Sequence, residues 1–317
     1  MKTASYFFLI SLLLPPTLVA QDTAEVPIAH AYNLEEQAHH DEVIALIRPL
    51  IESNTLHERE LGRAWQVLAL AYLNHGDYAS AQPAFERAIS ILKTSPNPSD
   101  YPVALENLSD LYFLTGQPSA AIELRQRALS ILEQLGDHAE IALTCNRLAA
   151  INLQFGNKKH GRKYLERTLQ EMQLATDLHD DDRADIYIVK AGFASDDGHW
   201  PAAIQDMNEA IHLWQSMFGE AHPNVGWDRM LLGQIYAKSG NMPDAEREMQ
   251  QGLADLEQTT GHSSPYYLQA ALAYAELLDK RGDHAKAARF RSTPEPALKP
   301  SSRTACNGCT ISVDALR

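Results

Sequence analysis

The stretch "YLNHGDYASAQPAFERAI", residues 72–89, decides the fold. Gly76 stands between two segments, residues 65–74 and 78–93, in which apolar side chains recur every three or four positions. That spacing is the period of an amphipathic helix. A glycine between two such segments is typical of a helix C-terminus, where the backbone takes a left-handed conformation. The stretch therefore predicts two helices joined by a tight turn.

The same arrangement recurs along the chain at intervals of 40 or 42 residues. The repeated glycines are Gly76, Gly116, Gly156, Gly198, Gly240 and Gly282. Five residues after each glycine, and seven before it, the residue is always Ala, Gly or Ser. Small residues at fixed positions allow two helices to approach closely, while larger ones such as Phe85 fill the space between them. One pair cannot bury its apolar face alone, so the period predicts an array of stacked helix pairs.

This pattern resembles the tetratricopeptide repeat family. The matching positions in the first full repeat are Trp65, Leu68, Ala69, Tyr72, Gly76, Tyr78, Ala81, Phe85 and Ala88. The basic family repeat has 34 residues. The longer period here, with the phrases "MFGEAHPNV" and "YPVALENLSDLY", is more similar to the kinesin-light-chain type, in an exported bacterial form. The resemblance implies an all-α fold, a right-handed superhelical solenoid of antiparallel helix pairs.

The pattern also divides the chain into segments. We expect a signal peptide over residues 1–20, an N-terminal segment with a degenerate first repeat over 21–61, and six repeats over 62–293. Residues 294–317 are expected to form a disordered tail, because they are rich in Pro and Ser. Asn152, Gly161 and Thr168 depart from the repeat pattern, which predicts a looser or bent third repeat.

The first twenty residues have the layout of a secretory signal peptide. Lys2 supplies a positive charge, "YFFLISLLL" is a short apolar core, and "PPTLVA" ends in the small residue Ala20. We therefore expect an exported protein, periplasmic or secreted, whose mature chain begins at or near Gln21. The alternative is an uncleaved anchor, which would make the protein a membrane-tethered assembly factor.

Charge restricts the kinds of partner. The formal net charge is −14 and the sequence pI is about 5.3. Nucleic-acid binding requires a basic face for phosphates, so the acidity disfavours that class. It also disfavours electrostatic docking on anionic lipid. The expected partner is a protein or peptide segment, with membrane contact only if the leader is retained.

No sequence motif indicates catalysis or a cofactor, so we expect a protein that is not an enzyme. "DLHDDDRAD", residues 177–185, could bind a divalent cation, but acids at a solvated helix N-terminus are the preferred interpretation. A metal protein or enzyme that uses His and Asp is the least favoured alternative. Cys145 is expected to be a small buried apolar residue. Cys306 and Cys309, in "CNGC", are interpreted as a local disulfide or an incidental pair rather than a redox pair or half a metal site.

The family resemblance implies that the first helix of each pair lines a concave binding face. The corresponding partner-binding candidates are Arg63, Gln66, Leu70, Glu106, Asn107, Asp110, Asn146, Arg147, Gln154, Asp185, Gln234 and Lys238. In related repeats an Asn at the positions of Asn107 and Asn146 bonds the backbone of an extended peptide. We expect these side chains to face solvent when no ligand is bound. The alternative is a solvated polar helix face. The Lys and Asn set that clamps a C-terminal carboxylate in some relatives is not reproduced.

Overall fold

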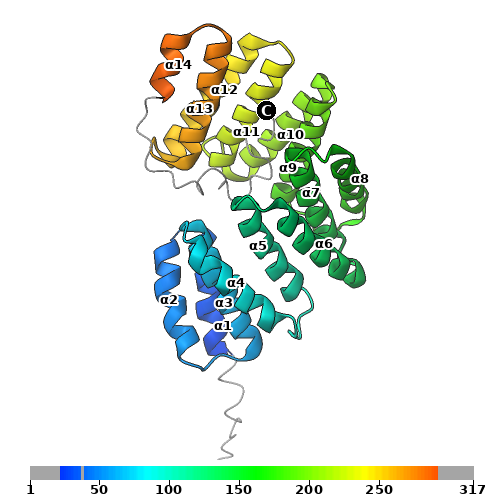
Figure 1. Cartoon of the computed structure of the whole chain (residues 1–317), viewed down its shortest axis with the longest axis vertical. Helices are drawn as coiled ribbons and strands as arrows, with labels where there is room; N and C mark the ends of the chain where they lie inside the picture. The colour runs from blue at the N-terminus through cyan, green and yellow to red at the C-terminus, as the bar shows by residue number, and fades with distance from the viewer. Residues whose placement is uncertain (1–21, 37–38, 292–317) are drawn as a thin grey trace, which may run out of the picture. The chain divides into compact units, whose positions relative to one another are not determined.

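The computed structural model describes residues 22–36 and 39–291. Every regular element in those ranges is an α-helix, and there are fourteen of them (Figure 1). The helices fall into two compact units, divided between Pro96 and Asn97. The predicted all-α fold of helix pairs is confirmed.

The first unit contains two helix pairs. Its helices are α1 (Asp22–Glu36), α2 (His40–Glu52), α3 (Glu58–Asn74) and α4 (Tyr78–Leu92). Helix α3 packs against the other three helices, and α1 also packs against α2. The Arg63 guanidinium of α3 lies 5.5 Å from the ring centre of Tyr32 in α1. The segment expected to hold a degenerate repeat thus lies on α1 and α2.

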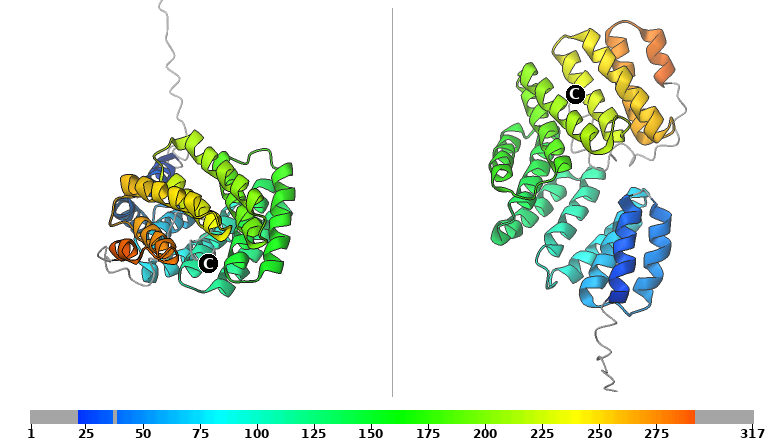
Figure 2. Two further views of the ribbon diagram at one scale, coloured as in Figure 1. Left: turned by 90° about the horizontal axis from the view of Figure 1, so that it is seen from above. Right: turned by 180° about the vertical axis from the view of Figure 1, so that it is seen from behind.

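The second unit contains five helix pairs. Its helices are α5 (Asp100–Leu114), α6 (Pro118–Leu135), α7 (His138–Gln154), α8 (Lys158–Leu174), α9 (Asp180–Asp196), α10 (Trp200–Phe218), α11 (Pro223–Lys238), α12 (Met242–Thr260), α13 (Pro265–Lys280) and α14 (His284–Arg291). Each second helix packs against the first helix of the next pair, and first helices also meet directly, α7 with α9 and α11 with α13. This succession can be followed by colour in Figure 2.

The repeated glycines form the turns that the sequence predicts. All six have a positive φ, between +73° and +88°. At Gly76 the glycine amide donates to the Leu73 carbonyl, and the Asp77 amide donates to the Tyr72 carbonyl at 2.8 Å. This pair of bonds closes a helix C-terminus with a left-handed residue. The Asp77 side chain then accepts from the Ser80 amide and caps α4.

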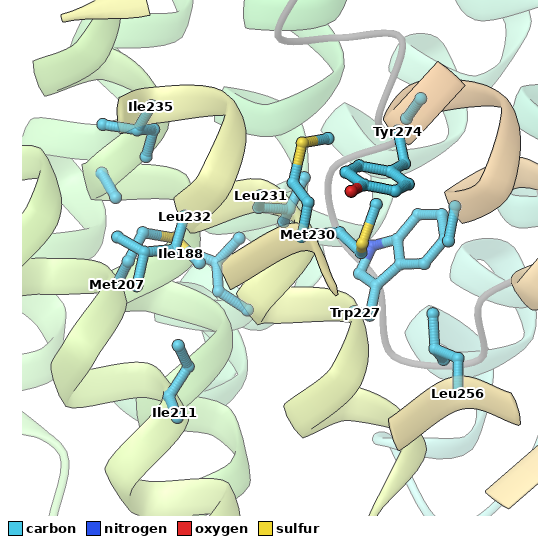
Figure 3. Packing of buried hydrophobic residues seen from close by; sticks show 14 of the residues in the cluster. Ile188, Met207, Ile211, Trp227, Met230, Leu231, Leu232, Ile235, Leu256 and Tyr274 are labelled. Carbon is cyan, nitrogen blue, oxygen red and sulfur yellow. The ribbon is translucent and has the colours of Figure 1, made fainter. Parts of the chain in front are cut away.

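The second unit buries a continuous apolar core. One cluster of buried residues extends from Ala149 of α7 to Ala287 of α14, and Figure 3 shows the part contributed by α9 to α13. The small residues flanking the repeat glycines are fully buried, as Ala203 and Ala245 illustrate. Because the four pairs from α7 to α14 contribute to the same cluster, each of these repeats is stabilised by its neighbours.

The helices of the third repeat are closely packed, although the sequence predicts a looser or bent repeat. A Cβ added at Gly161 would lie 2.7 Å from the Phe193 ring and 3.1 Å from the Ala149 carbonyl oxygen. Asn152 and Thr168 each donate to a backbone carbonyl one turn earlier in their own helix. The glycine therefore brings α7 and α8 together, and the two polar side chains have hydrogen-bond partners.

Several predictions fall outside the described residues: the signal peptide, the tail from 294 onward, and the pair Cys306 and Cys309. Helix α14 is short and ends at Arg291. No helix within 22–36 and 39–291 has both the length and the apolar character needed to cross a bilayer.

Candidate partner-binding surface

All twelve predicted partner-binding residues lie on first helices. Arg63, Gln66 and Leu70 are on α3 of the first unit. The other nine belong to the second unit: Glu106, Asn107 and Asp110 on α5, Asn146, Arg147 and Gln154 on α7, Asp185 on α9, and Gln234 and Lys238 on α11. The structure groups eight of these nine into a charge network, a set of unpaired oxygens and one pocket, and the half-buried Asn107 belongs to none of them.

Three of the candidates are buried, and for Asn146 this corrects the expectation that its side chain faces solvent. Gln66, Glu106 and Asn146 have exposed fractions of 5 %, 6 % and 1 %. Each stands ten residues before its repeat glycine. The contacts of Glu106 show the reason, because its carboxylate faces α7, the next first helix, rather than solvent.

A charge network joins α5, α6 and α7. The Glu106 carboxylate accepts from Arg147 Nη1 at 2.7 Å and from the Thr144 hydroxyl. Arg125 of α6, which is 3 % exposed, pairs with Asp110. Burial lowers the pKa of the Arg147 guanidinium. Four carboxyls around it, of which Glu106 has the largest effect, raise this pKa, and the net result is a raised pKa. These charges compensate one another, so the network serves the packing of the helices.

Arg125 was not predicted, although the sequence carries a signal for it. It stands nine residues after Gly116, where the first, third, fourth and fifth repeats have Phe or another large apolar residue. Burial lowers the pKa of its guanidinium, and Asp110 and Glu106 oppose that shift. A buried arginine needs such partners, and its position alone could have indicated a polar network.

Four candidates present a buried oxygen that has no hydrogen-bond partner among the described residues. They are Asn146 Oδ1, Gln154 Oε1, Asp185 Oδ1 and Gln234 Oε1. All four are on first helices of consecutive pairs, α7, α9 and α11. Buried polar atoms are normally paired, so a donor from a water molecule or from a ligand would complete the hydrogen bonding of each oxygen.

A pocket of about 320 Å³ opens between α11, α12 and α13. Its polar lining residues are Gln234, Lys238, Glu276 and Lys280, and Met242 and Met249 contribute apolar wall. Burial is the main cause that lowers the pKa of Lys238, and the charge of nearby Lys280 adds to that shift. The pocket can hold an apolar side chain beside a polar or charged group.

Two carboxyls near the start of α9 and α11 have a pKa well above the ordinary value. For Asp185 the main cause is burial, with Asp182 and Asp181 adding to it and Arg147 opposing it. Asp228 is 1 % exposed, and burial followed by the charge of Asp185 raises its pKa. Asp228 was not predicted. It stands twelve residues before Gly240, where every other repeat has Ala, Thr or Ile.

The acidic stretch before α9 forms a helix N-terminus, as the preferred interpretation states. Asp180, Asp181 and Asp182 make up the first turn of α9. The His179 amide donates to Asp182 Oδ2, which completes a capping box. Within 22–36 and 39–291, no three His, Cys, Asp or Glu side chains are grouped so that they could hold a metal ion.

A second groove, of about 520 Å³, lies between α6 and α8. Cys145 of α7 lies at its base and is fully buried, which confirms its predicted role as a small buried residue. Burial raises the pKa of its thiol to about 12, so the sulfur stays protonated. None of the predicted partner-binding residues lines this groove.

Comparisons with known proteins agree on the fold. Residues 62–91 match the family model described as tetratricopeptide repeat. No curated protein sequence matches the chain.

Among solved structures, the chain is similar to a Rap protein complexed with competence and sporulation factor. The two sequences are 16 % identical, the match covers 89 % of this chain and 77 % of that chain, and the TM-score is 0.63. Aspartyl phosphate phosphatase F from Bacillus subtilis is similar with 12 % identity, 93 % and 74 % coverage, and a TM-score of 0.66. The hetero-tetramer Cut9–Hcn1 of the APC/C shows 16 % identity, 87 % and 46 % coverage, and a TM-score of 0.63. Similarity at these identities concerns the fold.

Proposed function

Because the protein is built of tetratricopeptide-type repeats, we propose that it is a non-enzymatic scaffold that binds a protein or peptide segment along its first helices. The row of unpaired oxygens on α7, α9 and α11 carries this proposal. An extended peptide offers backbone N–H donors at regular intervals, and side-chain amides such as those of Gln154 and Gln234 can accept them.

Two of the similar structures support a binding role. One is a Rap protein in complex with competence and sporulation factor, and another is the Cut9–Hcn1 assembly. Both use the fold as part of a complex. The pocket beside Gln234 and Lys238 provides a place where an apolar side chain of a bound segment can be buried.

The proposal includes an exported location, periplasmic or secreted. It rests on the sequence of residues 1–20, with Lys2, the apolar run and Ala20. The partner would then be a protein or peptide of the same compartment.

Site-specific photo-crosslinking in cells tests where the partner binds. A photoreactive residue at Gln154, on α7, should capture the partner, whereas the same residue at Gln205, an exposed position of the second helix α10, should not. Capture from Gln205 but not from Gln154 would show that the partner binds the outer helices instead.

A further inference from the structure

The interface between α5 and α7 shows how a polar side chain ten residues before the repeat glycine is accommodated. Glu106 occupies this position on α5. Its two oxygens accept from Thr144 and Arg147, which stand twelve and nine residues before the next repeat glycine. The carboxylate is buried and its charge is compensated, as a structural ion pair requires.

The next interface, between α7 and α9, lacks these partners. Asn146 takes the place of Glu106, and the residues of α9 equivalent to Thr144 and Arg147 are Ile186 and Val189. Neither has a polar side-chain atom. Asn146 is 1 % exposed, and its Oδ1 has no hydrogen-bond partner among the described residues. The α7–α9 interface therefore contains a buried acceptor without a partner, whereas the equivalent side chain at the α5–α7 interface is hydrogen-bonded.

Asp185 adds a second acceptor beside the same interface. It directly precedes Ile186 on α9, and its Oδ1 is also buried without a hydrogen bond. The positive charge of Arg147 favours the ionised form of the Asp185 carboxyl, but the Arg147 guanidinium already donates to Glu106 at 2.7 Å. Asp182, from the first turn of α9, adds negative charge. The region thus has buried acceptor atoms in excess of its donors, and a cation beside Asp185 would favour the ionised carboxylate that burial disfavours.

We propose that the bound segment presents a positively charged side chain, an arginine or a lysine, to Asp185 and Asn146. This inference rests on the proposed function and specifies the chemistry of the partner. Guanidinium and ammonium groups carry only donors, so they match a site of acceptors. A carboxylate or phosphate of the partner would meet like charge. The net charge of −14 also favours the approach of a basic segment.

A peptide series tests the proposal. Fluorescein-labelled twelve-residue peptides with an Ala, Gly and Ser background would carry Arg, Lys, Gln or Glu at one central position. Their affinity for the full chain is measured by fluorescence anisotropy at one fixed salt concentration. The Arg and Lys peptides should bind more tightly than the Gln peptide, and the Glu peptide most weakly. Asp185→Asn should weaken the Arg peptide roughly tenfold to hundredfold, the range for one charge-assisted hydrogen bond.

Two controls separate binding from structure. Glu209→Gln removes the same charge from an exposed position of α10 and should leave the affinity unchanged. The melting temperature of Asp185→Asn should equal or exceed that of the natural chain, because the variant removes a carboxyl that burial disfavours in its charged form. Asp185→Asn should therefore lower the affinity for the Arg peptide without lowering the melting temperature. If Asp185 had a purely structural role, its replacement would lower the melting temperature.

The outcomes also distinguish this inference from the proposed function. If the Arg and Gln peptides bind equally, or if Asp185→Asn keeps the preference for Arg, the cation site is wrong while peptide binding stands. Absence of binding by every peptide would count against both.

Discussion

Asp228 is a buried carboxyl whose ionised form is disfavoured in the folded protein. Five of the six repeats have Ala, Thr or Ile at this position, and the fifth repeat has a carboxyl that is 1 % exposed. Burial raises its pKa well above the ordinary value, so folding favours the neutral form of the carboxyl. The unfolded chain ionises near pH 4. Stability is therefore highest below that pH and decreases as the pH rises toward the folded pKa.

Replacing this carboxyl should stabilise the protein. We expect Asp228→Ala to raise the free energy of unfolding at pH 7 by about 0.5–2 kcal/mol, in the range of other stabilising changes. At pH 4 the gain should be smaller, since Asp228 of the unfolded chain is then only about half ionised. Urea unfolding of the variant and the natural chain at the two pH values measures this. A loss of stability at pH 7 would mean that the contact of Asp228 with the Trp214 side chain outweighs the cost of burying the carboxyl.

His222 should give the second unit the opposite pH dependence. Its Nδ1 accepts from the Asn224 amide at the start of α11, and its ring stacks on Phe218 with ring centres 4.5 Å apart. Burial lowers its pKa, so the fold favours the neutral ring. This contribution is complete above the ordinary histidine pKa of about 6.5 and is lost as the pH falls through the folded value.

We therefore expect part of the fall in melting temperature between pH 7 and pH 5 to disappear in His222→Asn, which keeps a capping acceptor but does not titrate. His212→Asn, at an exposed position of α10, serves as the control and should leave the fall unchanged. The same slope in both variants would contradict the role of His222.

At the scale of the helix pair, glycine residues allow the two helices to approach each other closely. Helices α11 and α12 meet at Gly226 and Gly252, where a Cβ added to Gly252 would lie 2.5 Å from the Gly226 carbonyl oxygen. The backbone of a packed helix cannot move aside without shifting the whole element. At Gly62 an added Cβ would instead meet side-chain atoms of the buried Leu92, Cδ2 at 2.5 Å and Cγ at 2.6 Å, and a side chain can shift more readily than a helix backbone.

Gly252→Ala should consequently destabilise the protein, although alanine is the better helix former. Overpacking costs about 1–3 kcal/mol, and the gain in helix propensity returns up to about 1 kcal/mol. Gly62→Ala should cost less, or even stabilise. Thermal unfolding of the two variants compares them directly, and an equal effect would show that α11 and α12 separate easily.

At the scale of the whole molecule, the proposed export depends on residues 1–20, which have the layout of a signal peptide. Cleavage after Ala20 would leave a mature chain that begins one residue before Asp22, the first residue of α1. We expect intact mass measurement of the protein recovered from the exported fraction to place the mature N-terminus at or near Gln21. A mass that includes Met1 would instead support the membrane-tethered alternative.

The sequence by itself determined the helix pairs, their period and their turns. These features are local, because apolar spacing defines each helix and a glycine with positive φ ends it, as at Gly76. It also placed the residues that pack closely, such as Ala245, since small side chains recur at fixed offsets.

Only the tertiary structure decided which polar residues of the first helices are satisfied and which are not. Glu106 and Asn146 occupy equivalent positions, yet one is bonded and the other has an unpaired oxygen. The difference lies in the next first helix, where Arg147 meets Glu106, whereas the equivalent residue of α9 is Val189, which has no polar side-chain atom. Hydrogen bonding depends on residues about forty positions away in the sequence, and those become neighbours only when the helix pairs stack.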